Sequence, residues 1–410
     1  MLKRTLVRSA TAALSAGAVA AALAVTLAGP AQAASAWPAH VFAPYVDTGL
    51  SNTTLTTVAA DYGTKYFTLA FVNGSGCQWS LPNQSGWQSQ ISSLQSEGGD
   101  VSISFGGYTA DTDATDLGAA CSSASAMATQ VESVVTALGV THLDFDIESN
   151  ELTDSADYTR TAQALAQVRS WASSTGRSLS ISYTIPVLSS GFTSPGISVL
   201  DAAVANGFRP DVVNIMTMDY GSSGTEMGTA ADQALDASAS QLTSVFGVSS
   251  GSAYAMLGNT PMIGQNDSSG EIFTLADAST VESYAAQKGI AMLSFWSEGR
   301  DNGGCPGQTS ASSTCSGLSQ NSGAFTQAFQ SFTGGTSTST GSASPTPTAT
   351  ASSTPTSGGG GSCATAWSNS TAYTSGNEVS YNGQNWTANQ WNYNEVPGGA
   401  SGAWTSDGAC

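Results

Sequence analysis

Residues 34–332 alternate between short apolar segments and longer segments of helical length, and this alternation constrains the fold more than any other feature. Segments such as 155–174 carry apolar residues at the spacing of one helix face. An open doubly wound sheet is one possibility, but no G-x-G-x-x-G motif follows the first strand. Eight strands, each followed by a helix, instead predict a closed parallel (β/α)8 TIM barrel. The eight apolar segments are 41–46, 65–72, 101–105, 142–147, 179–185, 212–218, 253–257 and 290–296.

A segment with no side chain able to build a core divides the chain in two. Residues 333–362 are all Gly, Ser, Thr, Pro or Ala, which is the composition of a flexible tether. Beyond it, residues 363–410 contain several tryptophans and neither Lys nor Arg. So short a segment cannot form a large core, and we expect aromatic residues and one disulfide to hold it together.

The first 33 residues have the organisation of a secretory signal peptide. Residues 1–8 are basic, residues 9–29 are rich in Ala, Leu and Val, and a small-x-small sequence ends at Ala33. A transmembrane anchor is the alternative, which the Pro-Ala-Gln-Ala sequence at 30–33 disfavours. We therefore expect cleavage near Ala33 and a secreted, extracellular protein.

The chain is strongly acidic although charged residues are scarce. Lys and Arg number 10 against 29 Asp and Glu, so the formal charge is −19. Three of the cations, Lys3, Arg4 and Arg8, would leave with the signal peptide. So acidic a surface repels nucleic acid phosphates and anionic lipid headgroups. We expect a monomer that binds neither nucleic acid nor membranes and that acts on an uncharged substrate.

Six cysteines form an even set, as an oxidising compartment favours. The chain has two histidines and neither a C-x-x-C nor an H-x-x-x-H sequence, so no metal or other cofactor is expected. Many disulfide pairings are possible, and the positions favour nearest neighbours: Cys77–Cys121, Cys305–Cys315 and Cys363–Cys410.

Three acids alternate along the fourth predicted strand, whose sequence at 142–148 is HLDFDIE. Side chains alternate faces along a strand, so Asp144, Asp146 and Glu148 share one face. In a barrel that face is the lumen, and Glu148 lies at the C-terminal mouth, where active sites form. Desolvation and like-charge repulsion should raise at least one pKa, which keeps a general acid protonated near neutral pH. A solvated acidic edge strand is the alternative, which the apolar residues between the acids disfavour.

Four motifs in strand order resemble those of glycoside hydrolase family 18, the chitinases. The family pattern D-x-x-D-x-D-x-E matches at Asp144, Asp146 and Glu148, with Thr141 in place of its first Asp. The S-x-G-G motif matches residues 104–107, and the Met-rich end of the sixth strand matches residues 216–220. The family's tryptophan on the last strand matches Trp296. The resemblance covers nearly all of residues 38–332.

This resemblance implies a retaining, substrate-assisted hydrolysis of chitin and chitooligosaccharides, an exception to catalysis by two carboxylates. Glu148 would protonate the glycosidic oxygen and later activate water. The acetamido oxygen of the substrate would attack the anomeric carbon and give an oxazolinium ion. Asp146 would hold the acetamido N–H and balance the developing charge, while Asp144 would share its proton.

The end of the sixth strand supplies further candidates on the same resemblance. Residues 216, 218 and 220 share one face of the strand, so Met216 is a candidate for contact with the substrate. Met218 stands where many members have a tyrosine, so Tyr220 is the candidate for the missing hydroxyl, with a core or rim role as the alternative. Asp219 matches a substrate-contacting Asp, although alternation turns it from the lumen if the strand extends that far.

The last strand and the loops add weaker candidates. Trp296 would stack beneath the sugar in the cleaved subsite. Tyr45, at the end of the first strand, and Asn266, after the seventh, are further candidates for the cleft. Arg300, just past Trp296, is either a further cleft candidate or part of a salt bridge at the rim of the barrel.

The spacing between the sixth and eighth strands bears on the type of cleavage. About 75 residues separate Asp219 from Ser294. They leave no room for the extra α+β domain that walls the deep tunnels of processive relatives. A shallow cleft and endo-type cutting are therefore expected.

Residues 363–410 resemble the chitin-binding modules of carbohydrate-binding families 5 and 12, which are small and all-β. Trp391 and Tyr393 are the candidates for an exposed platform that stacks on chitin. We expect Trp367, Trp386 and Trp404 in the core, and a solubility or protein-contact module is the alternative. The residues that carry the match are Trp367, Tyr373, Gly376, Val379, Tyr381, Asn382, Gly383, Trp386, Ala388, Trp391, Pro397 and Trp404.

Two other functions are compatible with these motifs. One is a catalytically silent chitin-binding lectin, which the retention of Glu148 with both aspartates disfavours. The other is an endo-β-N-acetylglucosaminidase acting on glycoprotein glycans, which a tail suited to an insoluble polymer disfavours.

Overall fold

The computed structural model describes residues 37–334 and, in the C-terminal part, residues 363–368, 372–373, 377–388, 392–393, 396–398 and 404–410. The expected signal peptide at 1–33 lies outside the described residues, and so does most of the expected tether at 333–362. Contacts within the chain divide it into two units, residues 1–340 and residues 341–410.

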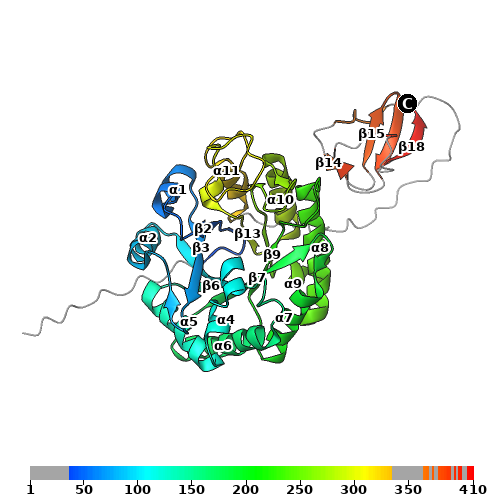
Figure 1. The fold of residues 1–410 in the computed structure, drawn as a ribbon. Coiled ribbons are helices and arrows are strands. Elements are labelled where there is room, and N and C mark those ends of the chain that lie inside the picture. Colours follow the sequence, from blue (N-terminus) through cyan, green and yellow to red (C-terminus); the bar gives the residue numbers. More distant parts are fainter. Residues whose placement is uncertain are drawn as a thin grey trace, which may run out of the picture. The chain divides into compact units, whose positions relative to one another are not determined.

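The first unit is a (β/α)8 barrel, as the alternation of segments predicts (Figure 1). Its parallel strands follow the order β1-β13-β10-β9-β7-β6-β5-β3-β2. β1 and β2 are two halves of the first strand, and β1 pairs with β13 while β2 pairs with β3, which closes the sheet. The strands are β1 Val41–Phe42, β2 Tyr45–Asp47, β3 Tyr66–Gly74, β5 Asp100–Gly106, β6 His142–Asp146, β7 Ser180–Leu188, β9 Val212–Met216, β10 Leu257–Thr260 and β13 Met292–Leu293.

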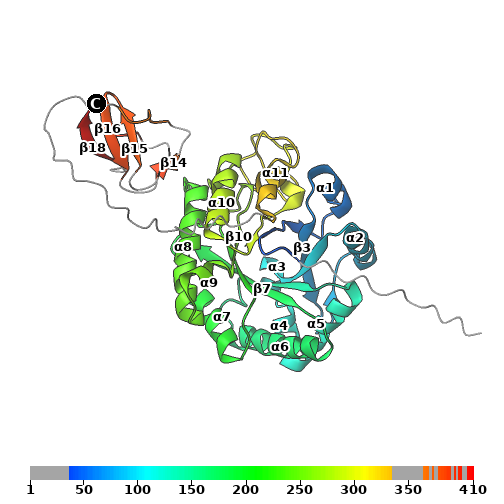
Figure 2. The ribbon, with the colours of Figure 1, turned by 180° about the vertical axis from the view of Figure 1, so that it is seen from behind.

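A ring of helices covers the outside of the strands, as opposite views show (Figures 1 and 2). In α5, for example, Ser123 caps the N-terminus by accepting a hydrogen bond from the Ala126 N–H, and Met127, Val131 and Val134 lie on its buried face. The helices are α1 Leu55–Tyr62, α2 Gln84–Ser96, α3 Tyr108–Asp113, α4 Leu117–Ala120, α5 Ala124–Leu138, α6 Ser155–Ser174, α7 Ser194–Ala205, α8 Met227–Phe246, α9 Ser250–Tyr254, α10 Leu275–Lys288 and α11 Ala324–Phe329.

Three of the predicted strands have wrong boundaries, and another is interrupted. The last strand was expected over 290–296, but β13 covers only Met292–Leu293. Segment 253–257 was expected as the seventh strand, but α9 ends at Tyr254 and β10 begins at Leu257. The cause is Ser249, whose side chain accepts from the Ser252 N–H and starts a helix within the apolar run. The sixth strand ends at Met216 rather than at residue 218. The first strand is broken before Tyr45 because Pro44 has no N–H to donate.

Loops at the strand ends carry short antiparallel strands. β4 Trp79–Ser80 pairs with β3, and β8 Gly191–Phe192 pairs with β7. β11 Gly264–Gln265 and β12 Ile272–Phe273 form a separate two-stranded sheet. No further domain is inserted between residues 220 and 293, all of which are described.

The second unit is a small antiparallel β fold. β15 Glu378–Tyr381, β16 Gln384–Ala388 and β18 Trp404–Ala409 form one sheet, and β14 Ala372–Tyr373 pairs with β17 Asn392–Tyr393. Trp404 is buried in its core, and Trp367 and Trp386 pack against that core, as the sequence predicts.

All three predicted disulfides are confirmed, and they use all six cysteines. The pairs are Cys77–Cys121, Cys305–Cys315 and Cys363–Cys410. The last of these joins the two ends of the small unit. Among the helices of the described residues, none has the length and apolar character to cross a bilayer.

Candidate active site

The alternation along β6 directs its two aspartates into the barrel. Asp144 and Asp146 are 1% and 5% exposed. Phe145 points to the opposite face, where its ring stacks on that of Phe105 with 4.7 Å between centroids. β6 ends at Asp146, so Glu148 lies in the first turn of the loop that follows. This arrangement agrees with the prediction that Asp144 and Asp146 face the lumen and that Glu148 follows them at the C-terminal end of the strand.

Asp144 is the most thoroughly hydrogen-bonded of the three acids. Its Oδ1 accepts from Ser182 Oγ (2.6 Å) and Thr184 Oγ1 (2.8 Å). Its Oδ2 accepts from Ser104 Oγ (2.7 Å) and Tyr45 Oη (2.8 Å). Burial raises the pKa of Asp144, while the hydroxyl donors favour its charged form and oppose that rise. Asp144 is therefore fixed in place by four donors from three strands, β2, β5 and β7.

Asp146 lacks comparable support. Its Oδ1 is buried and has no hydrogen-bond partner within the described part of the chain. Burial raises the pKa of Asp146 well above its ordinary value, and the charges of Glu148 and Asp144 raise it further. Asp146 therefore lies in a buried setting that favours its protonated form over its charged form.

Glu148 is only partly buried and borders the open end of the barrel. Burial raises its pKa to about 7, the charges of Asp219 and Asp267 raise it, and the Tyr108 N–H opposes the rise. A carboxylic acid with this pKa is half protonated at neutral pH, which suits both proton donation and proton acceptance.

Asp111 supports the backbone at Glu148, and no sequence motif pointed to this residue. The Glu148 N–H donates to Asp111 Oδ2 at 2.6 Å, and Asp111 is buried. Asp111 lies on α3, and a single Asp on a short helix matches no motif. At the start of the same helix, Tyr108 is 66% exposed.

The two glycines of the S-x-G-G motif allow the walls of the site to approach each other. Both have positive φ, 90° at Gly106 and 85° at Gly107. A Cβ on Gly106 would lie 2.3 Å from the Asp146 carbonyl oxygen, and one on Gly107 would lie 2.7 Å from the Phe71 ring. A side chain at Gly106 would therefore clash with the backbone of β6, and one at Gly107 would clash with the Phe71 ring on β3.

Trp296 is half-buried and lies beyond the end of β13 at Leu293, in an isolated bridge with Met262 rather than on the predicted strand. Its ring stacks on Phe71 with 5.8 Å between centroids and lies 6.0 Å from the Tyr45 ring. Phe71 was not predicted, because a Phe in an apolar strand has no distinguishing pattern. Met216 is buried at the end of β9, on the same face as Asn214, which hydrogen-bonds to Tyr45 Oη in the lumen.

Two predicted cleft residues prove to be supports instead. Tyr45 is buried, and its hydroxyl is used by Asp144, Thr184 and Asn214. Asn266 is also buried, with its Nδ2 donating to the carbonyls of Met262 and Gly264. Neither side chain is free to contact a substrate in this structure.

Asp219 and Tyr220 lie beyond the strand, so the predicted alternation does not apply to them. Asp219 has a φ of 51°, and its Oδ1 accepts from the Ser268 N–H. Its negative charge raises the pKa of Glu148, so the side chain is not turned away from the site as strand alternation would have it. The Tyr220 ring packs against the core, and its hydroxyl is buried with no hydrogen-bond partner among the described residues. The charges of Glu271 and Asp232 act on it, and its catalytic role stays a prediction.

Arg300 also differs from the expected rim ion pair. It is buried, and its guanidinium donates to the backbone carbonyls of Ile263, Gln265 and Ser312. It therefore holds the loops behind Trp296 together.

In the small unit, the predicted platform is only partly described. Trp391 lies outside the described residues, and Tyr393 belongs to β17, which pairs with β14.

A (β/α)8 barrel with carboxylic acids of raised pKa at its C-terminal mouth is the arrangement of a glycoside hydrolase. Comparison with known families agrees. Residues 41–261 match the glycosyl hydrolases family 18 model, and residues 366–405 match carbohydrate-binding module family 5/12. The chain belongs to glycosyl hydrolases family 18.

Individual relatives support the same assignment. The chain is 36% identical over 320 residues to the "Probable bifunctional chitinase/lysozyme" of Escherichia coli (strain K12), covering 73% of this chain and 35% of the relative. It is 36% identical over 282 residues to "Endochitinase 11" of Metarhizium anisopliae, covering 65% of this chain and 53% of the relative. The chain thus spans only part of the length of these relatives.

A solved structure resembles the barrel more completely. Active domain 2 of a chitinase from Pyrococcus furiosus superimposes with a TM-score of 0.66 at 31% sequence identity. The match covers 73% of this chain and 97% of that structure.

The network around Asp144 predicts the effect of removing one hydroxyl. In Tyr45→Phe, Asp144 loses one of its donors, so we expect the pKa of Asp144 to rise. Thr184 and Asn214 also lose a partner, so the free energy of unfolding should fall by about 1–3 kcal/mol. Thermal unfolding measures this, with Tyr108→Phe as the control on an exposed ring. Equal stability of the two variants would contradict the supporting role of Tyr45.

Proposed function

We propose that this chain is a secreted, endo-acting chitinase that hydrolyses β-1,4-linked N-acetylglucosamine polymers with retention of configuration. The observation that carries the proposal is the set of three acids at the barrel mouth, in which Glu148 has a pKa of about 7. Chitin is favoured as the substrate because the similar proteins are described as a chitinase/lysozyme, an endochitinase and a chitinase domain.

The geometry supports a reaction in which the substrate supplies the nucleophile. Ordinary retaining glycosidases use a second carboxylate to attack the anomeric carbon. Here Asp144 is surrounded by four hydroxyl donors, and Asp146 is 5% exposed, so neither carboxylate is placed to form a bond to the sugar. The neighbouring acetamido oxygen of the substrate is the remaining candidate.

In the proposed first step, Glu148 transfers its proton to the glycosidic oxygen as the bond to the anomeric carbon breaks. The acetamido oxygen closes on that carbon, while Asp146 orients the acetamido group by accepting from its N–H and balances the developing positive charge. The carboxylate of Glu148 then accepts a proton from water, which opens the oxazolinium ring. The same group acts as acid and then as base, which a pKa near 7 permits.

Three further features support the finer parts of the proposal. The region between residues 220 and 293 contains only barrel elements and the small β11–β12 sheet, which leaves the cleft without an added wall and favours endo cleavage. The pairing of all six cysteines favours an oxidising, extracellular location. A module that binds chitin would keep the barrel at a high local concentration of polymer.

The acid assignment is tested with Glu148→Gln, which keeps the shape of the side chain and removes its proton. We expect wild type to release short oligomers from chitin and from soluble N-acetylglucosamine oligomers. The variant should lose about 10²–10⁴-fold in rate and still bind insoluble chitin. If wild type binds chitin but cuts neither substrate, the enzyme proposal fails and a chitin-binding lectin is favoured.

The pH dependence is tested with Asp219→Asn. Removing this negative charge should lower the pKa of Glu148 from about 7. The general acid would then lose its proton at lower pH, so the alkaline limb of the kcat/KM profile should move to lower pH. Asp201→Asn, at an exposed site on α7, serves as the control. An unmoved alkaline limb in Asp219→Asn would show that Asp219 does not set the pKa of Glu148.

A further inference from the structure

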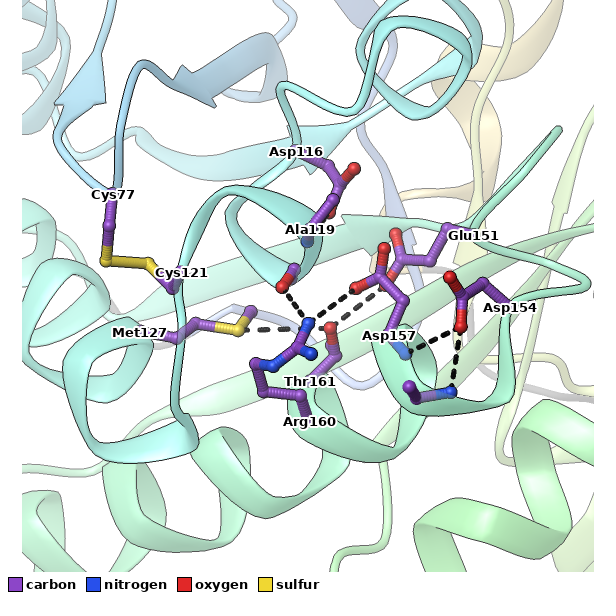
Figure 3. A network of polar contacts seen from close by, with 12 residues as sticks. Cys77, Asp116, Ala119, Cys121, Met127, Glu151, Asp154, Asp157, Arg160 and Thr161 are labelled. Carbon is purple, nitrogen blue, oxygen red and sulfur yellow. Dashed lines mark hydrogen bonds and ion pairs between the residues drawn. A yellow bond between two sulfur atoms is a disulfide. The ribbon is translucent and has the colours of Figure 1, made fainter.

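Three buried acids converge behind the catalytic loop, outside the site described above. Asp116 precedes α4, Glu151 lies in the loop after β6, and Asp157 lies in the first turn of α6. They are 2%, 5% and 5% exposed. One carboxylate oxygen from each lies within 4.8 Å of the others. Figure 3 shows the three side chains pointing toward one another from separate segments.

The protein itself satisfies only some of these oxygens. Asp116 Oδ1 accepts from the Ala119 N–H at 2.7 Å, and Glu151 Oε1 accepts from Thr161 Oγ1 at 2.9 Å. Asp116 Oδ2 and Asp157 Oδ1 are buried without a hydrogen bond from any described residue. Burying carboxylate oxygens without donors is costly, so these atoms indicate a ligand that supplies positive charge.

A cavity of about 10 Å³ adjoins two of the three acids, Asp116 and Glu151, and Thr161. That is roughly the space for one water-sized particle. Apolar residues, among them Phe105 and Phe145, form the rest of its lining. Gly106 lines the cavity too, and a Cβ placed on it would lie 3.3 Å from Asp111 Oδ1. Asp111 Oδ1 is a further buried oxygen for which the described residues provide no donor.

The nearest basic side chain does not balance the charge. Arg160 Nη1 donates to the Gly118 carbonyl and lies 3.8 Å from Asp157 Oδ1. One guanidinium against three carboxylates leaves two negative charges if all three acids are ionised. Mutual repulsion and burial therefore raise the pKa of Asp157 to about 7 and that of Glu151 well above its ordinary value.

We propose that Asp116, Glu151 and Asp157 bind one calcium ion. Ca²⁺ accepts carboxylate oxygens at about 2.3–2.6 Å, so ligand atoms on opposite sides of it are about 5 Å apart. The three oxygens lie within 4.8 Å of one another, which this geometry allows. Ca²⁺ also accepts irregular, carboxylate-rich sites more readily than Mg²⁺, which demands a near-ideal octahedron. The sequence did not suggest the site because its ligands are oxygens spread over three elements.

The ion would join the catalytic loop to the outer helices. Glu151 is three residues beyond Glu148, and the Leu152 N–H donates to the Glu148 carbonyl in the same turn. Asp116 directly precedes α4, whose other end is fastened by the Cys77–Cys121 disulfide (Figure 3). Calcium would thus stabilise the loop that carries the proposed acid, without touching the substrate.

The test is calcium binding by the full chain after treatment with EDTA and removal of the chelator. Isothermal titration calorimetry should show one Ca²⁺ per chain, with weaker binding of Mg²⁺. Thermal unfolding should shift upward by roughly 5 °C when free Ca²⁺ exceeds the Kd 100-fold. If wild type shows neither saturable binding nor a shift, the proposal is overturned, and shared protons neutralise the cluster instead.

Variants separate this site from adventitious binding to an acidic surface. Asp157→Asn keeps the side-chain shape but removes one charged ligand, and Asp201→Asn removes an exposed charge on α7. We expect the first to lose calcium binding and the thermal shift, and the second to keep both. If Asp157→Asn does not fold, Glu151→Gln serves in its place. Equal binding by wild type and the cluster variants would overturn the proposal, because calcium would then bind elsewhere. These readouts do not depend on chitin hydrolysis.

Discussion

The site depends on a carboxylate that is buried among hydroxyl groups. Asp144 accepts from Tyr45, Ser104, Ser182 and Thr184, which belong to β2, β5 and β7 on both sides of β6 and across the lumen. This network holds the buried Asp144 carboxyl group in place beneath Asp146. Burial raises the pKa of Asp146, and the charges of Glu148 and Asp144 raise it further. The electrostatic environment of Asp146 is therefore set by the acids on either side of it along the barrel lumen.

The sequence predicted much of this arrangement because its strongest signals are periodic. Alternation along residues 142–148 placed two aspartates in the lumen, and eight apolar segments predicted the barrel. The glycines at 106 and 107 could be recognised as a motif. Their physical reason, contact with the Asp146 carbonyl and the Phe71 ring, needs the three-dimensional structure.

What the sequence did not predict lies where periodicity ends. β9 ends at Met216, and Asp219 has a positive φ. The alternation of side chains along the strand therefore does not extend to Tyr220. A single serine cap turned the start of the seventh predicted strand into helix. Tyr45 and Asn266 were recognised as important positions, but burial and hydrogen bonding make them supports. Asp111 has no motif, because its role depends on one backbone N–H that is remote in sequence.

The central claim is that the substrate's acetamido group, and not a protein carboxylate or a water molecule, attacks the anomeric carbon. The most direct measurement is ¹H NMR of the first products formed from a soluble N-acetylglucosamine oligomer, recorded before mutarotation. The same oligomer without its acetyl groups serves as the comparison. The account predicts β-anomers from the acetylated oligomer and no cleavage of the deacetylated one. Initial α-anomers, or equal cleavage of both oligomers, would contradict it.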